Sequence, residues 1–399
     1  MPQSKHLILL ALALSLTSAM AANSPMFRGD PAHTGVYAAP DQPIAGKIAW
    51  SFQGVNYGLF AALEGLDGSY KFPTTPAVVD DRIYYCIGPF LFVVDEAGKE
   101  VYHVKLSAGT LASPAVVGGI LYVPTNDGKL HALDAANGLE RWTATIGPAQ
   151  FLNQVDNWDV FHSSAVVVDG MLYIGSVDGR IYALSAAEGK ELWHFQTQHV
   201  VRATPAVADG RVYCGSFDGK VYALDAKTGN KIWEVSTKTK GIPWHAVQGS
   251  CATAGGLVYV GSRSGFLYAI EAATGEIRWR DNHHGNWMPS SPAVRDGVAY
   301  VGQSDGCKIT AVGPEGKPLW VYSAPNETFA SPALAGDVLY AATNDNYNLK
   351  GKGSLSALDI KSGKARWTLE FPASIWSSPV VVGGTVYIGC ADGKLYAVR

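Results

Sequence analysis

Side chains that could bind a ligand recur at one position of an internal repeat. Eight times an aliphatic residue precedes a tyrosine, at Tyr84, Tyr122, Tyr173, Tyr213, Tyr259, Tyr300, Tyr340 and Tyr387. Eleven residues before each tyrosine stand Pro73, Leu111, His162, Arg202, Gln248, Pro289, Phe329 and Trp376. Three consecutive copies have the polar residues His162, Arg202 and Gln248 at this position, and the last two copies have the aromatic residues Phe329 and Trp376. Polar donors that face aromatic rings would suit a flat, anionic or carbonyl-bearing ligand. Alternatively, the polar groups only satisfy backbone carbonyls around a water-filled channel.

A second set of candidates lies in the connections between repeats. Trp158, Trp244, Trp287 and Trp376 all precede the start of a repeat, and His245 follows Trp244. The connection 149–161 is an insertion that carries Trp158 between Asp156 and Asp159. Since connections of a repeat protein gather on one face and often carry function, we assign Trp158, Trp244, His245 and Trp287 to partner binding.

Signals for catalysis and for metal binding are weak. His283 and His284 are adjacent, so on a strand they would point to opposite faces, and no HExxH spacing occurs. There is no GxSxG, P-loop or CxxCH motif. The recurring Asp127, Asp178, Asp218, Asp305 and Asp392 precede or stand beside glycines and are expected in hairpin turns. We therefore predict no catalytic residue and no metal site.

The repeat predicts the elements that position these residues. In the copy from Arg202 to Trp233, alternating segments at 204–208, 211–216, 220–224 and 231–233 are separated by glycine-containing turns. Such a pattern is typical of a four-stranded antiparallel meander. Successive tyrosines are 38 to 51 residues apart, the period of a propeller blade. The fold class predicted is all-β, an eight-bladed β-propeller of four-stranded antiparallel blades.

The two chain ends complement each other. Seven blades are expected to end in Tyr102, Trp142, Trp193, Trp233, Trp279, Trp320 and Trp367. The last copy, 377–399, stops after three strands, whereas residues 47–50 resemble an outer strand without inner strands. An N-terminal strand that completes the last blade would close the ring and remove open sheet edges. We predict one propeller domain at 47–399, preceded by an N-terminal extension at 22–46.

The first 21 residues have the features of a signal peptide. Lys5 precedes an apolar run at 7–16, and Ala19-Met20-Ala21 is a small-x-small cleavage site. The chain is expected to be periplasmic or secreted. No cysteine precedes Cys86, so no thiol is available near the cleavage site for a lipid anchor, and the mature protein is expected to be a soluble monomer. A formal net charge of −3 provides no basic surface for nucleic acid. Five unevenly placed cysteines argue against a disulfide framework.

The repeat resembles a known family. The run from Tyr222 to Trp233 is similar to the repeat of pyrroloquinoline-quinone-type β-propellers, as are 270–279 and 358–367. Met26-Phe27-Arg28-Gly29-Asp30-Pro31 with His33-Thr34-Gly35 resembles the start of many exported proteins of this kind. The resemblance covers both quinoprotein dehydrogenases and the non-catalytic scaffold propeller of the outer-membrane β-barrel assembly machinery. This chain departs from the enzymes in lacking adjacent cysteines, and from the scaffold in lacking a lipid-attachment cysteine.

Three functions follow from these features. The first is a binding or scaffold module in the cell envelope, with no chemistry of its own, whose partner is another envelope protein or a small ligand. The second is a small quinoprotein oxidoreductase, with pyrroloquinoline quinone and Ca²⁺ in the central funnel, Trp376 or Phe329 against the quinone, and Arg202 as a polar contact. The third is a binder of carbohydrate or of small ligands through the loop tryptophans.

Overall fold

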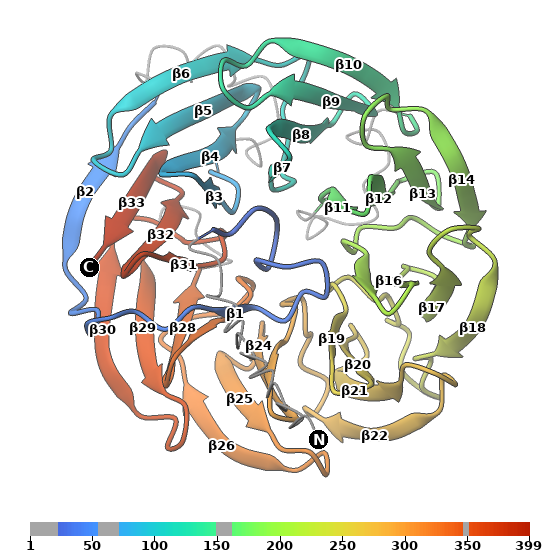
Figure 1. The fold of residues 1–399 in the computed structure, drawn as a ribbon. Coiled ribbons are helices and arrows are strands. Elements are labelled where there is room, and N and C mark those ends of the chain that lie inside the picture. The colour runs from blue at the N-terminus through green and yellow to red at the C-terminus, as the bar shows by residue number, and fades with distance from the viewer. Residues whose placement is uncertain (1–22, 55–71, 149–161, 346–350) are drawn as a thin grey trace, which may run out of the picture.

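The computed structural model describes residues 23–54, 72–148, 162–345 and 351–399. The predicted signal peptide, the proposed partner residue Trp158 and the two aspartates beside it lie outside the described residues. Eight four-stranded antiparallel blades surround one axis, and a short fifth strand, β1 (Val36–Tyr37), is added to one of them, which confirms the predicted propeller (Figure 1). In blades 1 to 7 the four strands run in sequence order from the axis to the rim, and in blade 8 the N-terminal strand β2 (Ile48–Phe52) takes the place at the rim.

The blades are numbered in chain order. Blades 1 to 4 consist of β3 (Ala77–Val79), β4 (Arg82–Ile87), β5 (Phe90–Asp95) and β6 (Glu100–Lys105); β7 (Ala115–Val117), β8 (Ile120–Thr125), β9 (Lys129–Asp134) and β10 (Glu140–Thr145); β11 (Val166–Val168), β12 (Met171–Gly175), β13 (Arg180–Ser185) and β14 (Glu191–Gln196); and β15 (Ala206–Ala208), β16 (Arg211–Gly215), β17 (Lys220–Asp225) and β18 (Lys231–Ser236).

Blades 5 to 8 continue the same order around the axis. They consist of β19 (Ala252–Ala254), β20 (Leu257–Gly261), β21 (Phe266–Glu271) and β22 (Ile277–Asn282); β23 (Ala293–Arg295), β24 (Val298–Gln303), β25 (Lys308–Val312) and β26 (Pro318–Ser323); β27 (Ala333–Ala335), β28 (Val338–Thr343), β29 (Gly353–Asp359) and β30 (Ala365–Phe371); and β31 (Val380–Val382), β32 (Thr385–Cys390) and β33 (Lys394–Val398), which β2 (Ile48–Phe52) completes.

The N-terminal strand closes the ring as predicted. β2 pairs antiparallel with β33, with Ile48 opposite Val398. The backbone N–H groups of Lys47 and Arg399 each donate to the other residue's carbonyl, at 2.8 and 2.9 Å. Blade 8 is therefore built from both ends of the chain, and its third strand has no open edge.

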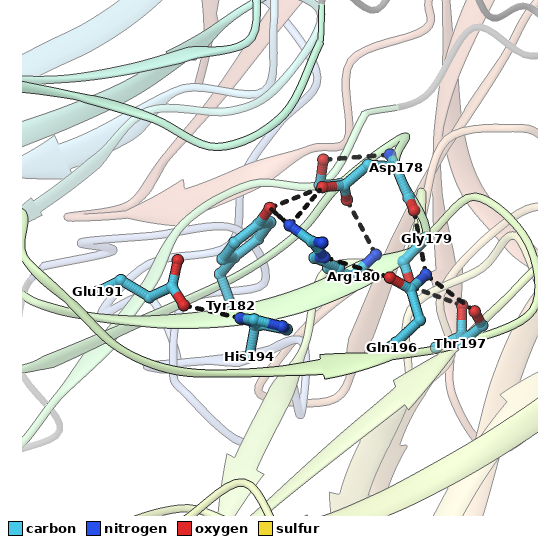
Figure 2. Close-up of polar contacts among 9 residues, drawn as sticks. Asp178, Gly179, Arg180, Tyr182, Glu191, His194, Gln196 and Thr197 are labelled. Carbon is cyan, nitrogen blue, oxygen red and sulfur yellow. Dashed lines mark hydrogen bonds and ion pairs between the residues drawn. The ribbon is translucent and has the colours of Figure 1, made fainter.

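The recurring aspartates are turn residues, as expected. In blade 3 the Asp178 carboxylate accepts hydrogen bonds from the Arg180 backbone N–H at 3.0 Å and from the Tyr182 hydroxyl at 2.6 Å (Figure 2). The same Asp–Tyr bond joins Asp218 to Tyr222 in blade 4. These carboxylates hold the turn between the second and third strands of the blade.

The rim tryptophans join neighbouring blades. Each indole Nε1–H group donates to a backbone carbonyl of the next blade or, for Trp367, of the segment that leads into β2. The distances are 2.7 to 3.2 Å: Trp50 to Glu96, Trp142 to Ala186, Trp193 to Ala226, Trp233 to Ala272, Trp279 to Pro314, Trp320 to Ile360 and Trp367 to Ile44. In blade 1 the Tyr102 hydroxyl makes the equivalent bond to Ala135. These are the seven tryptophans that the repeat predicts to be structural.

The N-terminal extension lies across the inner strands, at the centre of the ring (Figure 1). Its carbonyls accept hydrogen bonds of 2.7 to 2.8 Å from six inner strands: Val78 to Ser24, Val116 to Pro25, Val207 to Pro31, Thr253 to Ala32, Val294 to Thr34 and Leu334 to Gly35. The short strand β1 (Val36–Tyr37) then pairs parallel with β27. The extension therefore packs as part of the propeller, which the sequence pattern does not predict.

Arg28 anchors this segment. Its guanidinium is fully buried and donates to the carbonyls of Pro332 at 2.6 Å and Pro292 at 3.0 Å, which belong to blades 7 and 6. A side chain at Gly35 would collide with this guanidinium, and Gly35 also has a positive φ of 64°. Packing in the channel thus explains Arg28 and Gly35 of the N-terminal motif.

Candidate functional site

The axial channel contains the positions that the repeat alignment predicts. Seven of the eight predicted positions line a small cavity of about 60 Å³: Pro73, Leu111, His162, Arg202, Gln248, Pro289 and Trp376. The eighth, Phe329, packs against Trp376 with ring centroids 5.2 Å apart. The alignment therefore brings the right residues together at the axis.

Hydroxyl groups form the next layer of the channel. A backbone N–H of each of blades 2 to 8 donates to a hydroxyl of the next blade at 2.9 to 3.0 Å: Ser113 to Ser164, Ser164 to Thr204, Thr204 to Ser250, Ser250 to Ser291, Ser291 to Ser331, Ser331 to Ser378 and Ser378 to Thr75. The last bond crosses from blade 8 to blade 1. These hydroxyl oxygens are therefore already acceptors of the structural ring, and Phe27 of the N-terminal extension lies beside them in the cavity wall.

The aromatic side of the channel is filled by its own residues. Trp376 packs against Phe329 at 5.2 Å and against Phe72 at 5.4 Å, and only 8% of its surface is exposed. The expectation that Phe329 and Trp376 offer open aromatic planes to a ligand does not match this packing. The rings form a buried cluster because each covers the apolar face of another.

The polar side of the channel is cationic and buried. Arg202 lies 2% exposed in the cavity wall. Burial and the nearby Arg202 charge hold the pKa of His162 well below its usual range, so His162 is neutral at physiological pH. Gln248 accepts a hydrogen bond from Arg263 Nε at 3.0 Å through its Oε1.

Arg263 is a site residue that the repeat alignment misses. Its guanidinium lies 4.4 Å from the ring centroid of Trp287 and 5.1 Å from that of Phe217, which is cation–π geometry. Arg263 stands in the turn Ser262-Arg263-Ser264-Gly265, where blade 4 has Ser216-Phe217-Asp218-Gly219. This departure from the repeat is the signal that could have revealed it.

The predicted partner residues lie in unlike environments. Trp244 is 56% exposed, the most exposed tryptophan among the described residues. His245 is partly buried, and its carbonyl accepts a hydrogen bond from the Thr237 hydroxyl at 3.1 Å. Trp287 is partly covered by Arg263. Trp244 is thus the one aromatic of this described set that is open for contact, with Trp287 set deeper.

The described channel does not fit a pyrroloquinoline quinone and Ca²⁺ site. Ca²⁺ requires several oxygen ligands, usually including carboxylates, and the described cavity wall contains no aspartate or glutamate. The described residues also contain no group of three or more histidine, cysteine, aspartate or glutamate side chains placed to hold a metal ion. A cavity of about 60 Å³ is small beside the roughly 300–1,000 Å³ of typical ligand pockets.

A family model agrees with this architecture over most of the chain. The model, described as outer membrane protein assembly factor BamB, matches residues 36–157, 153–286 and 284–399. The chain belongs to this family. Among solved structures, the BamB-type propeller is similar to BamB from Moraxella catarrhalis, with a TM-score of 0.66 and 17% identity over 88% of this chain and 97% of that one. It is also similar to the quinohemoprotein alcohol dehydrogenase from Comamonas testosteroni, with a TM-score of 0.72 and 16% identity over 96% of this chain and 81% of that one.

Curated relatives match only in part. The quinohemoprotein alcohol dehydrogenase of Comamonas testosteroni is 35% identical over 96 residues, 24% of this BamB-type chain and 14% of the enzyme. The serine/threonine-protein kinase AfsK of Streptomyces coelicolor is 33% identical over 140 residues, 34% of this chain and 16% of the kinase. These matches establish a shared pyrroloquinoline-quinone-like repeat. They span a small part of each relative, so they do not transfer its activity.

Proposed function

We propose that this propeller is a binding or scaffold module of the cell envelope, exported to the periplasm or secreted. Its partner is a protein that binds the funnel-side face, by which we mean the face that carries the connections leading into the inner strands. The observation that carries the proposal is the filled axial channel. Trp376 is packed among aromatic rings, Phe27 of the N-terminal extension lies in the cavity wall, and the hydroxyl groups of the channel accept hydrogen bonds from backbone N–H groups. Among the described residues, no helix has the length and apolar character needed to cross a bilayer.

The funnel-side surface supplies a contact site in place of a cofactor pocket. Trp244 is an exposed aromatic on the connection into blade 5, and Trp287 with Arg263 lies on the connection and turn beside it. Aromatic and arginine side chains are enriched where proteins bind each other most strongly. We assign the partner contact to this side of the ring.

Site-specific photo-crosslinking in cells tests the location of the contact. A photoreactive amino acid at position 244 should yield one defined adduct, whereas the same group at Leu319, an equally exposed rim residue, should not. Loss of the adduct when Trp287 is also changed to alanine would support a shared surface. Equal adducts from positions 244 and 319 would contradict the proposal.

The quinoprotein alternative rests on Arg202 and Trp376, which do lie in one channel. Titration of the purified protein with pyrroloquinoline quinone and Ca²⁺, followed by tryptophan fluorescence and by alcohol- or sugar-dependent dye reduction, separates the two functions. We expect no stoichiometric binding and no turnover. Binding with turnover would overturn the scaffold proposal. The carbohydrate alternative predicts instead that sugars quench the fluorescence of Trp244, which Trp244→Phe should alter.

A further inference from the structure

A hydrogen-bonded serine, histidine and glutamate lie in a cleft between blades 1 and 2, away from the axial channel. Ser107 Oγ is 2.8 Å from His131 Nε2, and His131 Nδ1 is 2.8 Å from Glu140 Oε2. Ser107 follows β6 at the rim of blade 1, His131 is on β9 and Glu140 begins β10 of blade 2. The three residues belong to two blades, and Ser107 and Glu140 are 33 positions apart in the sequence. No sequence motif connects them.

The histidine is an exception to the repeat. At its position on the third strand, blades 3, 4 and 8 carry Tyr182, Tyr222 and Tyr396, and each donates to the turn aspartate of its own blade. Blade 2 has His131 there, and the carboxylate of the turn residue Asp127 instead accepts a hydrogen bond from Thr125 at 2.6 Å, is hydrogen-bonded by the Ser107 hydroxyl, and pairs with the Lys129 ammonium at 3.3 Å. The imidazole is therefore free of that structural bond and faces Ser107 and Glu140.

The hydrogen bonds define the tautomer of His131. An ionised glutamate only accepts hydrogen bonds, so Nδ1 carries the proton that Glu140 accepts; in a neutral imidazole Nε2 then has a lone pair, which faces Ser107 Oγ. Hydrogen bonds from Thr143 and from His131 lower the pKa of Glu140, which keeps it ionised at neutral pH. Thr143 Oγ1 also lies 3.2 Å from His131 Nδ1 and helps to hold the ring.

Two histidines on outer strands also pair with glutamate, but they differ from this arrangement. His103 bonds Glu100 and His194 bonds Glu191, three residues away on the same strand, and these histidine side chains are 54% and 40% exposed. The His131 side chain is 7% exposed, and its second nitrogen meets a serine. Burial of the imidazole and exposure of the serine are what a nucleophile and its base require.

The surroundings can hold a small substrate. A cleft of about 620 Å³ opens over the three residues. Val104, Leu106, Leu133 and Leu139 supply apolar wall. Lys105 and Lys129 line the same cleft, and the Lys129 ammonium lies 3.3 Å from Asp127 Oδ2. An apolar acyl group would pack on the leucines, and a cation nearby would stabilise negative charge that develops on a carbonyl oxygen.

We propose that Ser107, His131 and Glu140 form a serine-nucleophile site that hydrolyses small esters with apolar acyl groups. Ser107 Oγ attacks the ester carbonyl carbon while its proton passes to His131 Nε2. The carbon–oxygen bond to the leaving group breaks, and the leaving alkoxide takes that proton, so an alcohol and an acyl-serine result. Water then attacks the acyl carbon, giving its proton to His131 and from there to Ser107 Oγ, and the carboxylic acid is released. Glu140 is a positioning residue that holds the imidazole and its tautomer.

An active-site-directed fluorophosphonate tests the nucleophile directly. Incubation of the full purified chain, followed by peptide mass spectrometry, should place the phosphonyl group on Ser107. Ser107→Ala should remove both the label and the hydrolysis of p-nitrophenyl acetate above the rate of a matched control, Ser236→Ala. Ser236 is an exposed serine at the end of β18 whose hydroxyl accepts a hydrogen bond from the Lys238 backbone N–H.

A second variant keeps the test valid if a change at His131 disturbs folding. His131→Tyr restores the residue that blades 3, 4 and 8 carry and should fold at least as well as the native chain. It should lower the labelling rate of Ser107 by about 100-fold, the usual contribution of a general base. Glu140→Gln should lower the labelling rate of Ser107 by about tenfold. Replacing the carboxylate of a buried triad by an amide lowers the rate far more, but the Glu140 side chain is 53% exposed.

The pH profile separates chemistry from structure. In the native chain the labelling rate should be lower in acid than at neutral pH, and in His131→Tyr this difference should disappear. Absence of phosphonyl adduct on Ser107, or equal hydrolysis by the Ser107→Ala and Ser236→Ala chains, would overturn the proposal.

Discussion

The indole Nε1–H of Trp367 donates a 2.7 Å hydrogen bond to the carbonyl of Ile44, 323 residues earlier in the chain. Every other rim tryptophan reaches a turn of the next blade, but the turn that would precede the outer strand of blade 8 is cut by the chain ends. The segment that leads into β2 supplies the missing carbonyl. The ring is thus closed twice, by strand pairing and by this indole.

This bond predicts a specific weakening in Trp367→Phe. The change keeps an aromatic ring but leaves the Ile44 carbonyl without its donor, at a cost of about 1 kcal/mol. Trp320→Phe is the matched control, because Trp320 makes the same bond to Ile360 within a continuous turn. Both variants should lose similar stability in urea, but only Trp367→Phe should expose residues 38–46 to limited proteolysis. Equal proteolysis of both would contradict a second closure at Ile44.

Gly229, in the turn between β17 and β18, is predicted to be required both because a side chain would not fit there and because its backbone has a positive φ. A Cβ on Gly229 would lie 2.6 Å from the Trp193 indole, and φ is 72°. Gly210 has a similar φ of 69° but nothing within 4 Å. Gly210→Ala should cost about 1 kcal/mol for the left-handed backbone. Gly229→Ala should cost about 1–3 kcal/mol more because the indole must move. Similar unfolding free energies for the two variants would show that the indole adapts freely.

Two classes of tryptophan are predicted to respond differently to removal. Trp233 is 7% exposed and bonds the Ala272 carbonyl, so Trp233→Ala should cost about 3–5 kcal/mol through an emptied site between blades. Trp244→Ala should change the free energy of unfolding by less than about 0.5 kcal/mol because its ring is mostly in solvent. Chemical denaturation checks both. A large loss from Trp244→Ala would mean that this ring is part of the core.

Acid is predicted to loosen the N-terminal extension. His33 is completely buried beside Arg28, and burial, then the Arg28 charge, lower its pKa to about 3. The unfolded histidine binds a proton below about pH 6.5 and the folded one does not, so stability is complete above that pH and falls as the pH drops. The loss from His33 alone should reach about 2 kcal/mol at pH 5.

His33→Gln isolates this contribution. His162 also has a lowered pKa and acts in the same direction, so the variant should keep part of the acid sensitivity. Hydrogen exchange at Thr253 and Val294, whose amides donate to the carbonyls of Ala32 and Thr34 on either side of His33, should quicken at pH 5 in the native chain after correction for intrinsic rates. An unchanged pH dependence in His33→Gln would show that His33 does not titrate against folding.

The repeat made much of the architecture predictable. Alternating apolar residues between Gly-containing turns predict a strand, because successive side chains point to opposite faces. The same pattern recurs eight times, so the number of blades and the closure by residues 47–50 could be inferred. The register also placed seven of eight channel positions correctly, since residues at equal repeat positions occupy equal places around an axis. Trp158 and the insertion around it lie outside the described residues and stay a prediction.

What only the tertiary structure decided are contacts between unlike residues of different blades. Phe72, Phe329 and Trp376 form one cluster although 304 residues separate the first from the last, and Arg28 bonds blades 6 and 7 from the other end of the chain. Ser107, His131 and Glu140 likewise meet only once two blades pack. Sequence alone determined the ring, because local backbone geometry and apolar burial repeat with a period. The channel's packing and the cleft between blades 1 and 2 depend on single side chains at the exceptions, which leave no periodic signal and meet only in three dimensions.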